Sequence, residues 1–131
     1  MTRALSAIRA IDHVQIAIPV GGEEKARPFY RDVLGLTEVP KPAKQAARGG
    51  LWFEAGAVKV HLGVEQDFRA NDKAHVAFVV DDVAALVAAA RDAGYRVRDD
   101  EPLPGMVRAF VYDPFGNRIE ILKPRETGEG P

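Results

Sequence analysis

The sequence predicts an α+β fold built from two tandem β-α-β-β-β units, and three observations lead to this prediction. Each half contains one segment with helical periodicity. On both sides of it lie segments in which every second residue is apolar. Similar landmarks recur at offsets of 62 and 59 residues, as His13 with His75 and Gly35 with Gly94. A chain of 131 residues holds one core rather than two independent domains. Because one such unit cannot bury its own sheet fully, we expect mixed sheets that pack as a half-open barrel around a cleft.

The first unit is predicted over residues 11–66. It begins with a half-buried strand at residues 13–18, in which the even-numbered residues are apolar. Apolar residues at helical spacing then predict a helix from about residue 24 to Gly35, where glycine favours a helix end. The remaining strands form a predicted hairpin at residues 51–54 and 57–64.

The second unit is predicted over residues 67–124 and repeats this order. A strand at residues 75–80 leads to Asp81-Asp82, which offers a helix cap, and Gly94 ends the helix that follows. The remaining strands are predicted at residues 95–98, 106–112 and 117–123, the last after a turn at 113–116.

Four segments lie outside these elements. Residues 1–10 form an expected N-terminal extension, and residues 125–131 form an expected flexible tail with nothing to bury. Residues 40–50 and 99–105 are loops at matched places in the two units. Such a loop is either a solvated connection or a cover over a pocket, and the sequence is compatible with both.

Composition excludes several classes of function. The chain has 18 Lys and Arg against 19 Asp and Glu, so it lacks the basic excess of a nucleic-acid-binding protein. It has no cysteine, which excludes disulfides, thiolate metal sites and a cysteine nucleophile. No run of apolar residues is long enough for a signal peptide or a membrane span. We therefore expect a cytoplasmic protein with a small-molecule ligand and without a nucleic-acid or membrane partner.

Four potential metal ligands share one orientation in the predicted strands. Because strand side chains alternate, each lies opposite the apolar residues that face the helices. Imidazole and carboxylate groups bind Zn²⁺, Fe²⁺, Mn²⁺ or Ni²⁺, although a single His or Glu in a strand is often only a satisfied or exposed side chain. Their matched positions favour a metal site in the cleft between the two units. The four residues are His13, His61, His75 and Glu120.

Other residues on the same faces are candidates for substrate binding. Gln15, Lys59 and Arg118 favour an anionic or oxygen-rich ligand if they line the cavity, whereas at its rim Lys59 and Arg118 only reach solvent. Trp52 is a candidate for a stacking wall or for the core. Asp12 and Asp113 lie near strand ends and are expected to make turns.

Two motifs resemble the vicinal oxygen chelate superfamily. They are residues 29–36, FYRDVLGL, on the first helix, and residues 113–120, DPFGNRIE, before the last strand. The superfamily includes glyoxalase I, methylmalonyl-CoA epimerase, extradiol dioxygenases, fosfomycin-resistance enzymes and bleomycin-binding proteins. The resemblance covers residues 10–124 and implies the duplicated fold predicted above.

The resemblance also implies a site and a chemistry. The superfamily's metal ligands fall on His13, His61, His75 and Glu120, and a divalent metal there would hold two neighbouring oxygens of a substrate. Glyoxalase I usually carries a carboxylate at the position of His61, so this chain departs from it. His61 is then either a fourth ligand or a pocket residue beside a two-His-one-carboxylate set. Glu120 and His61 are the candidate catalytic residues.

Three functions fit these features. The first is a metal-dependent lyase, isomerase or dioxygenase acting on a small molecule with vicinal oxygens. The second is a metal-free protein that sequesters a small molecule, as bleomycin-resistance proteins do. The third is an accessory domain with a degenerate site. Relatives commonly dimerise, and some build the cavity across subunits, so the resemblance implies a homodimer.

Overall fold

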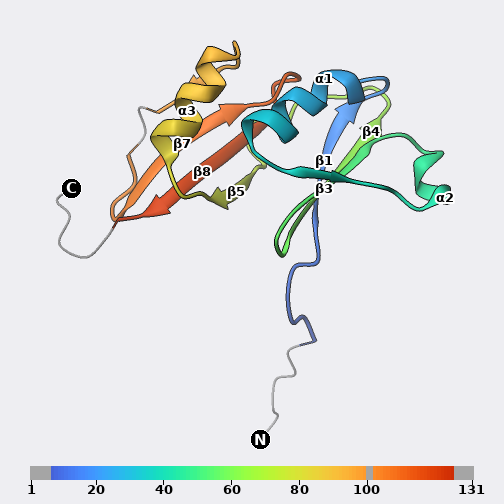
Figure 1. The fold of residues 1–131 in the computed structure, drawn as a ribbon, viewed down its shortest axis with the longest axis horizontal. Helices are drawn as coiled ribbons and strands as arrows, with labels where there is room; N and C mark the ends of the chain where they lie inside the picture. The colour runs from blue at the N-terminus through green and yellow to red at the C-terminus, as the bar shows by residue number, and fades with distance from the viewer. Residues whose placement is uncertain (1–6, 100–101, 126–131) are drawn as a thin grey trace, which may run out of the picture.

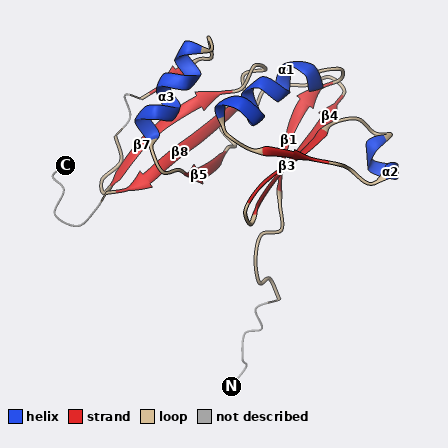
Figure 2. Ribbon diagram, in the orientation of Figure 1, coloured by secondary structure: helices blue, strands red, loops and turns tan. Residues whose placement is uncertain are grey.

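The computed structural model describes residues 7–99 and 102–125 and places them in two four-stranded mixed sheets (Figures 1 and 2). Each sheet is accompanied by one principal helical segment, so both halves have the predicted β-α-β-β-β order. The tandem fold predicted from the sequence is confirmed.

The first module has β1 at its edge, parallel to β4, and its sheet order is β1-β4-β3-β2. The alternation predicted for β1 and β4 orients apolar side chains to the core, with Ile18, Val60 and Leu62 at most 1% exposed. The elements are β1 Val14–Pro19, α1 Glu23–Arg27, η1 Pro28–Val33, β2 Thr37–Val39, α2 Ala43–Ala46, β3 Leu51–Ala55 and β4 Val58–Glu65.

The first helical segment differs from a regular α-helix in its second half. At Pro28, α1 passes into the π-helical turn η1, and the Leu34 amide donates to the Phe29 carbonyl, five residues back. Proline lacks an amide hydrogen and its ring crowds the preceding turn, which is a physical reason for the wider turn. Gly35, at φ 76°, ends the segment where the sequence predicted. The short helix α2, within loop 40–50, was not predicted.

The second module repeats the topology, with sheet order β5-β8-β7-β6 and β5 parallel to β8. The helix cap is Asp82 rather than Asp81, because the Asp82 carboxylate accepts a hydrogen bond from the Ala85 amide at 3.0 Å. The elements are β5 Val76–Val79, α3 Val83–Asp92, β6 Val97–Arg98, β7 Met106–Tyr112 and β8 Arg118–Pro124.

The two modules share one core and are joined by hydrogen bonds that are buried or partly buried. The Tyr30 hydroxyl of the first module donates to the Asp113 carboxylate of the second at 2.7 Å. The side-chain amide of Asn117 donates to the backbone carbonyl of Ala17 at 2.9 Å. Asp113 also accepts hydrogen bonds from the amides of Phe115 and Asn117, which confirms its predicted role in the turn.

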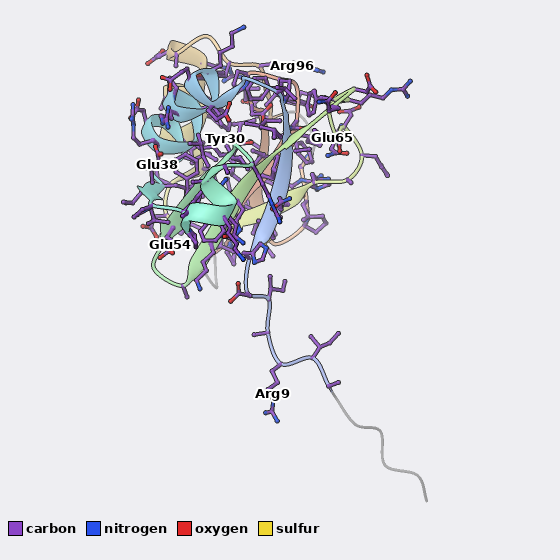
Figure 3. The ribbon with its side chains drawn as sticks, turned by 90° about the vertical axis from the view of Figure 1, so that its right-hand side faces the viewer. Arg9, Tyr30, Glu38, Glu54, Glu65 and Arg96 are labelled. Atoms are coloured by element: carbon purple, nitrogen blue, oxygen red, sulfur yellow. The ribbon has the colours of Figure 1, made fainter. Side chains whose placement is uncertain are left out.

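The sheets lie side by side and are not closed into a barrel within one chain (Figure 1). The helices α1 and α3 lie on the same side of the molecule, so neither of them covers the opposite sheet faces (Figure 2). Arg9 lies on a segment that extends away from the folded body (Figure 3). None of the described helices is long and apolar enough to cross a membrane.

Candidate functional site

The first module brings His13 and His61 together in an aromatic stack. Their ring centroids are 4.1 Å apart, with an interplanar angle of 20°. Trp52 is the cross-strand partner of His61 and stacks on it at 4.1 Å and 6°. The His61 ring therefore lies between an imidazole and an indole, and Trp52 contributes to this wall rather than to the core.

An acidic residue fixes the orientation of His13. The Asp12 carboxylate lies 2.9 Å from the His13 Nδ1, and the Lys59 Nζ lies 3.7 Å from its other oxygen. The His13 hydrogen bond, followed by the Lys59 charge, lowers the pKa of Asp12. Asp12 thus contacts a candidate ligand instead of making the turn expected from the sequence. A carboxylate on Nδ1 leaves the other imidazole nitrogen available to a metal.

The surroundings of His61 disfavour its protonated form. Burial, followed by the charge of His13, lowers its pKa from the ordinary value. A neutral imidazole retains a nitrogen lone pair, which a metal ion or a substrate proton requires.

The second module brings His75 and Glu120 together in an imidazole–carboxylate pair. The His75 Nε2 lies 2.9 Å from a Glu120 oxygen, and its Nδ1 lies 2.8 Å from the Lys73 carbonyl. The second Glu120 oxygen lies 3.6 Å from the Arg108 guanidinium. Glu120 is buried, with 7% of its surface exposed. Burying a carboxylate is costly unless a cation compensates it, and Arg108 provides one such compensation.

The four predicted ligands thus form two pairs, not one cluster. Among the residues that the structure describes, no group of three or more His, Asp or Glu side chains lies close enough to hold one metal ion. The expected convergence of all four within one chain is not observed. The physical reason is the open arrangement of the two sheets, each of which carries one pair.

Two cavities adjoin these pairs. The first cavity, of about 480 Å³, is lined by His13, His61, Trp52, Lys59 and Gln15, among others. The second cavity, of about 230 Å³, is lined by His75, Arg118 and again Gln15. All the candidate substrate-binding residues therefore line a cavity.

Gln15 lines both cavities because a glycine leaves room for its side chain. A Cβ at Gly63 would lie 2.7 Å from the Gln15 Nε2. Arg118 lies 3.5 Å from Asp72 and 4.7 Å from the Phe110 ring centre, while its Nε is buried without a hydrogen bond among the described residues. Arg118 is therefore more enclosed than a rim residue.

Three neighbours of the site were not assigned to it from the sequence. Asp12 directly precedes His13, and that adjacency was a usable signal. Arg108 falls on the same face of β7 as Phe110, the cross-strand partner of Glu120, and strand alternation could have identified it. Arg48, which lines the first cavity, follows the unpredicted helix α2 and had no such signal.

The donor set fits a divalent metal of borderline softness. Imidazole nitrogens and a carboxylate oxygen suit Zn²⁺, Fe²⁺, Mn²⁺ and Ni²⁺. The 2.9 Å between the His75 nitrogen and the Glu120 oxygen is close to the ~3 Å that separates adjacent ligand atoms at ~2.1 Å from one metal. The Asp12–His13 contact supplies the outer carboxylate that metal-bound histidines commonly have.

Comparisons with known proteins identify the family to which the chain belongs. The family model described as the Glyoxalase/Bleomycin resistance protein/Dioxygenase superfamily matches residues 10–121. A lactoylglutathione lyase of Haemophilus influenzae is 33% identical over 123 residues, which cover 85% of this chain and 91% of the relative.

Solved structures show the same similarity. A putative glyoxalase family protein from Bacillus anthracis superposes with a TM-score of 0.87 at 43% identity, covering 93% of this chain and all of the other. An antibiotic binding protein from a Streptomyces species superposes with a TM-score of 0.70 at 23% identity, covering 92% of this chain and 100% of the other. The latter match concerns the fold alone.

Proposed function

Because the chain belongs to the Glyoxalase/Bleomycin resistance protein/Dioxygenase superfamily, the vicinal oxygen chelate proteins, we propose that it is a divalent-metal-dependent enzyme. Its substrate is a small molecule with two neighbouring oxygens, and its reaction is that of a lyase, an isomerase or a dioxygenase. The metal is Zn²⁺, Fe²⁺, Mn²⁺ or Ni²⁺. The observation that carries the proposal is the pair of matched half-sites, His13 with His61 and His75 with Glu120.

A homodimer completes the site in this proposal. Each module offers two ligands on the sheet face opposite α1 or α3, and the two faces of one chain are not closed on each other. A twofold axis that sets the first face of one chain against the second face of another would unite the pairs. His13 and His61 of one subunit would then share a metal with His75 and Glu120 of the partner subunit, giving two sites per dimer.

The chain's own residues have distinct tasks at this site. A bound metal would supply Lewis-acid polarisation of two neighbouring substrate oxygens. Asp12 holds the His13 ring in orientation, and Arg108 steadies Glu120. The pKa of His61 is lowered by burial and by the charge of His13, which favours the neutral imidazole, and its lone pair can accept a proton or coordinate a metal. Glu120 is the carboxylate available to move a proton.

Substrate binding is assigned to residues that line the two cavities. Trp52 provides a flat apolar surface beside His61. Gln15, Lys59 and Arg118 are placed to bind substrate oxygens or negative charge. Because His61 stands where glyoxalase I usually has a carboxylate, the proposal does not extend to the lactoylglutathione reaction.

Metal analysis tests the proposal. Protein purified without chelator is expected to contain one divalent metal per chain, and His75→Ala and Glu120→Ala are each expected to lose it. Ala77→Ser, a change on the same face of β5 that removes no proposed ligand, serves as the matched control and should retain the metal. Wild-type protein that is metal-free and cannot be reloaded would refute the proposal.

A second candidate function is metal-free binding of a flat ligand. The stack of Trp52, His61 and His13 along the first cavity favours it, since such rings can hold an aromatic molecule without a metal. Ligand-induced thermal stabilisation that persists unchanged in EDTA would support this function over the first.

A further inference from the structure

We propose that the segment of residues 40–50 selects substrates that carry a carboxylate, and that Arg48 is the residue that binds it. The inference rests on the proposed function in one respect, namely that the first cavity receives the substrate. Lys41, Gln45 and Arg48 all line this cavity together with His13 and His61. The segment therefore contributes a wall of the cavity, and is more than a solvated connection between β2 and β3.

The end of this segment is fixed against the first sheet. Gly50 has a φ of 87°, and a Cβ there would lie 2.1 Å from the Leu62 carbonyl oxygen, so only glycine allows this close approach. The Gly50 amide donates to the Glu23 carboxylate at 2.9 Å. The Lys41 ammonium donates to the Gly49 carbonyl, which ties the two ends of the segment together.

Arg48 is held at the cavity by the backbone of α2. Its amide donates to the Gln45 carbonyl at 3.1 Å, and the following Gly49 amide donates to the Ala46 carbonyl at 3.2 Å. These bonds extend the helical turn of α2 as far as Gly49, the residue before Gly50, where the backbone lies against β4. The position of the Arg48 backbone is therefore defined, while its side chain lies at the exposed edge of the cavity.

The cations of the first cavity differ in how far they are already neutralised. Lys59 lies 3.7 Å from Asp12 and is the cross-strand partner of Glu54, the other acid in the lining. Lys41 is committed to the Gly49 carbonyl, and its charge helps to lower the pKa of Glu23. Arg48 makes no ion pair or hydrogen bond through its side chain within the described ranges. Of the three Lys and Arg residues in this lining, Arg48 is therefore the one least neutralised by its neighbours and best placed to bind an anionic group of a ligand.

The chemistry of Arg48 defines the ligand class. A guanidinium presents a planar fork of donors that matches a carboxylate through two parallel hydrogen bonds. One uncompensated cation balances one negative charge, which favours a monoanionic carboxylate over a dianionic phosphate. The preferred substrate would thus combine two neighbouring oxygens, directed to the histidines, with a carboxylate at another end of the molecule.

Paired probes test this inference. The first is 3-(3,4-dihydroxyphenyl)propionate, which has a catechol with neighbouring oxygens and a separate carboxylate, and the second is its neutral methyl ester. Binding is measured by quenching of Trp52, the single tryptophan of the sequence and a residue of the cavity wall. Wild-type protein is expected to bind the carboxylate about tenfold more tightly than the ester.

Substitutions on the same segment test which residue causes the preference for the carboxylate over the ester. Arg48→Gln is expected to bring the ratio of the two affinities close to one, and Arg48→Lys is expected to keep part of it. Lys44→Gln is the matched control, because Lys44 is an exposed cation of α2 that does not line the cavity. It should leave the ratio unchanged. A thermal unfolding midpoint for each variant verifies that the fold is intact.

Repeating the titrations after EDTA treatment separates this inference from the proposed function. If the protein needs no metal, EDTA changes neither affinity, yet the preference for the carboxylate and its dependence on Arg48 remain. The inference is overturned by a wild-type ratio near one, by an unchanged ratio in Arg48→Gln, or by failure of both probes to quench Trp52.

Discussion

The two sheet faces carry their candidate ligands at matched places but in opposite chemical settings. On the first face, His61 is stacked between His13 and Trp52, and its pKa is lowered. On the second face, His75 meets the Glu120 carboxylate, which is also close to the Arg108 guanidinium. The first face therefore offers two imidazoles beside an indole, and the second offers an imidazole and a buried carboxylate.

In the proposed function, this difference divides the ligands of one metal site between the two copies of the unit. Metal sites in proteins commonly take three or four protein ligands, whereas each face offers two candidate ligands. The side chain of His13 is 40% exposed and that of Glu120 only 9%, so the first face is also the more accessible. Under the proposed function, the substrate would enter from the first face, and Glu120 on the second face would compensate the charge of the metal.

The largest effect is expected from removing the charge of the second face. Glu120→Gln keeps the shape of the side chain but removes the carboxylate that the proposal needs for the metal and for proton transfer. We expect loss of bound metal and a fall in turnover of at least about 10²-fold. Metal analysis and steady-state kinetics measure both. Retention of metal and turnover in this variant would remove Glu120 from the site.

A smaller effect is expected from loosening a ligand on the first face. Asp12→Asn weakens the contact that orients His13 without removing either imidazole. Metal affinity is expected to fall by about 10- to 100-fold, as for other outer carboxylates of metal-bound histidines. A competition titration with a chelating dye measures the affinity. If it is unchanged, Asp12 has no part in orienting the ligand.

The strand pattern predicted which side of its own sheet each residue occupies. Alternation placed His61 opposite Val60 and Leu62, and Glu120 opposite Ile119 and Ile121, and all four apolar residues are buried. Alternation is a property of a single strand, so it carries no information on the angle between two sheets. For this reason the sequence could not reveal that the ligand set divides into two pairs.

Three local features of the structure could not be predicted from the pattern of apolar residues. The π-helical turn η1 preserves the apolar spacing of a helix, so periodicity does not distinguish it from an α-helix. The helix α2 spans only four residues, too few to produce a periodic signal. The contact of Asp12 with His13 depends on an extended segment before β1, which lies outside the strand pattern.

A buried hydrogen bond between Tyr30 and Asp113 helps to hold the two modules, and so the two faces, together. Tyr30→Phe removes the buried hydrogen bond to Asp113 and leaves that carboxylate one partner short. We expect the free energy of unfolding to fall by about 1–3 kcal/mol, measured by urea denaturation. Phe29→Leu, a change in the same core without a polar group, is the comparison for packing loss alone. A Tyr30→Phe protein of wild-type stability would show that this bond contributes nothing.

The smallest effect is expected at the anchor of the 40–50 segment. The hydrogen bond from the Gly50 amide is the main cause of the lowered pKa of Glu23, relative to its ordinary value of 4.5. A lowered folded-state pKa stabilises the protein above the unfolded pKa, and this contribution is lost as the pH falls through the folded value. Glu23→Gln should therefore cost a few tenths of a kcal/mol near neutral pH and nothing in acid. Thermal midpoints across pH 3 to 7, roughly the range that brackets the titration, check this, and a pH-independent difference would contradict it.

Complementation between two defective variants tests the central claim most directly. His13→Ala and Glu120→Ala are each expected to lose both sites of a homodimer, because every site contains one altered residue. When the two chains are mixed and allowed to exchange, each dimer that contains one chain of each variant regains one intact site of its two, so isolated mixed dimers should hold about half of the wild-type metal per chain. Metal content measured on isolated mixed dimers gives the result. No recovery in verified mixed dimers, or full metal in a monomeric wild type, would contradict a site shared between subunits.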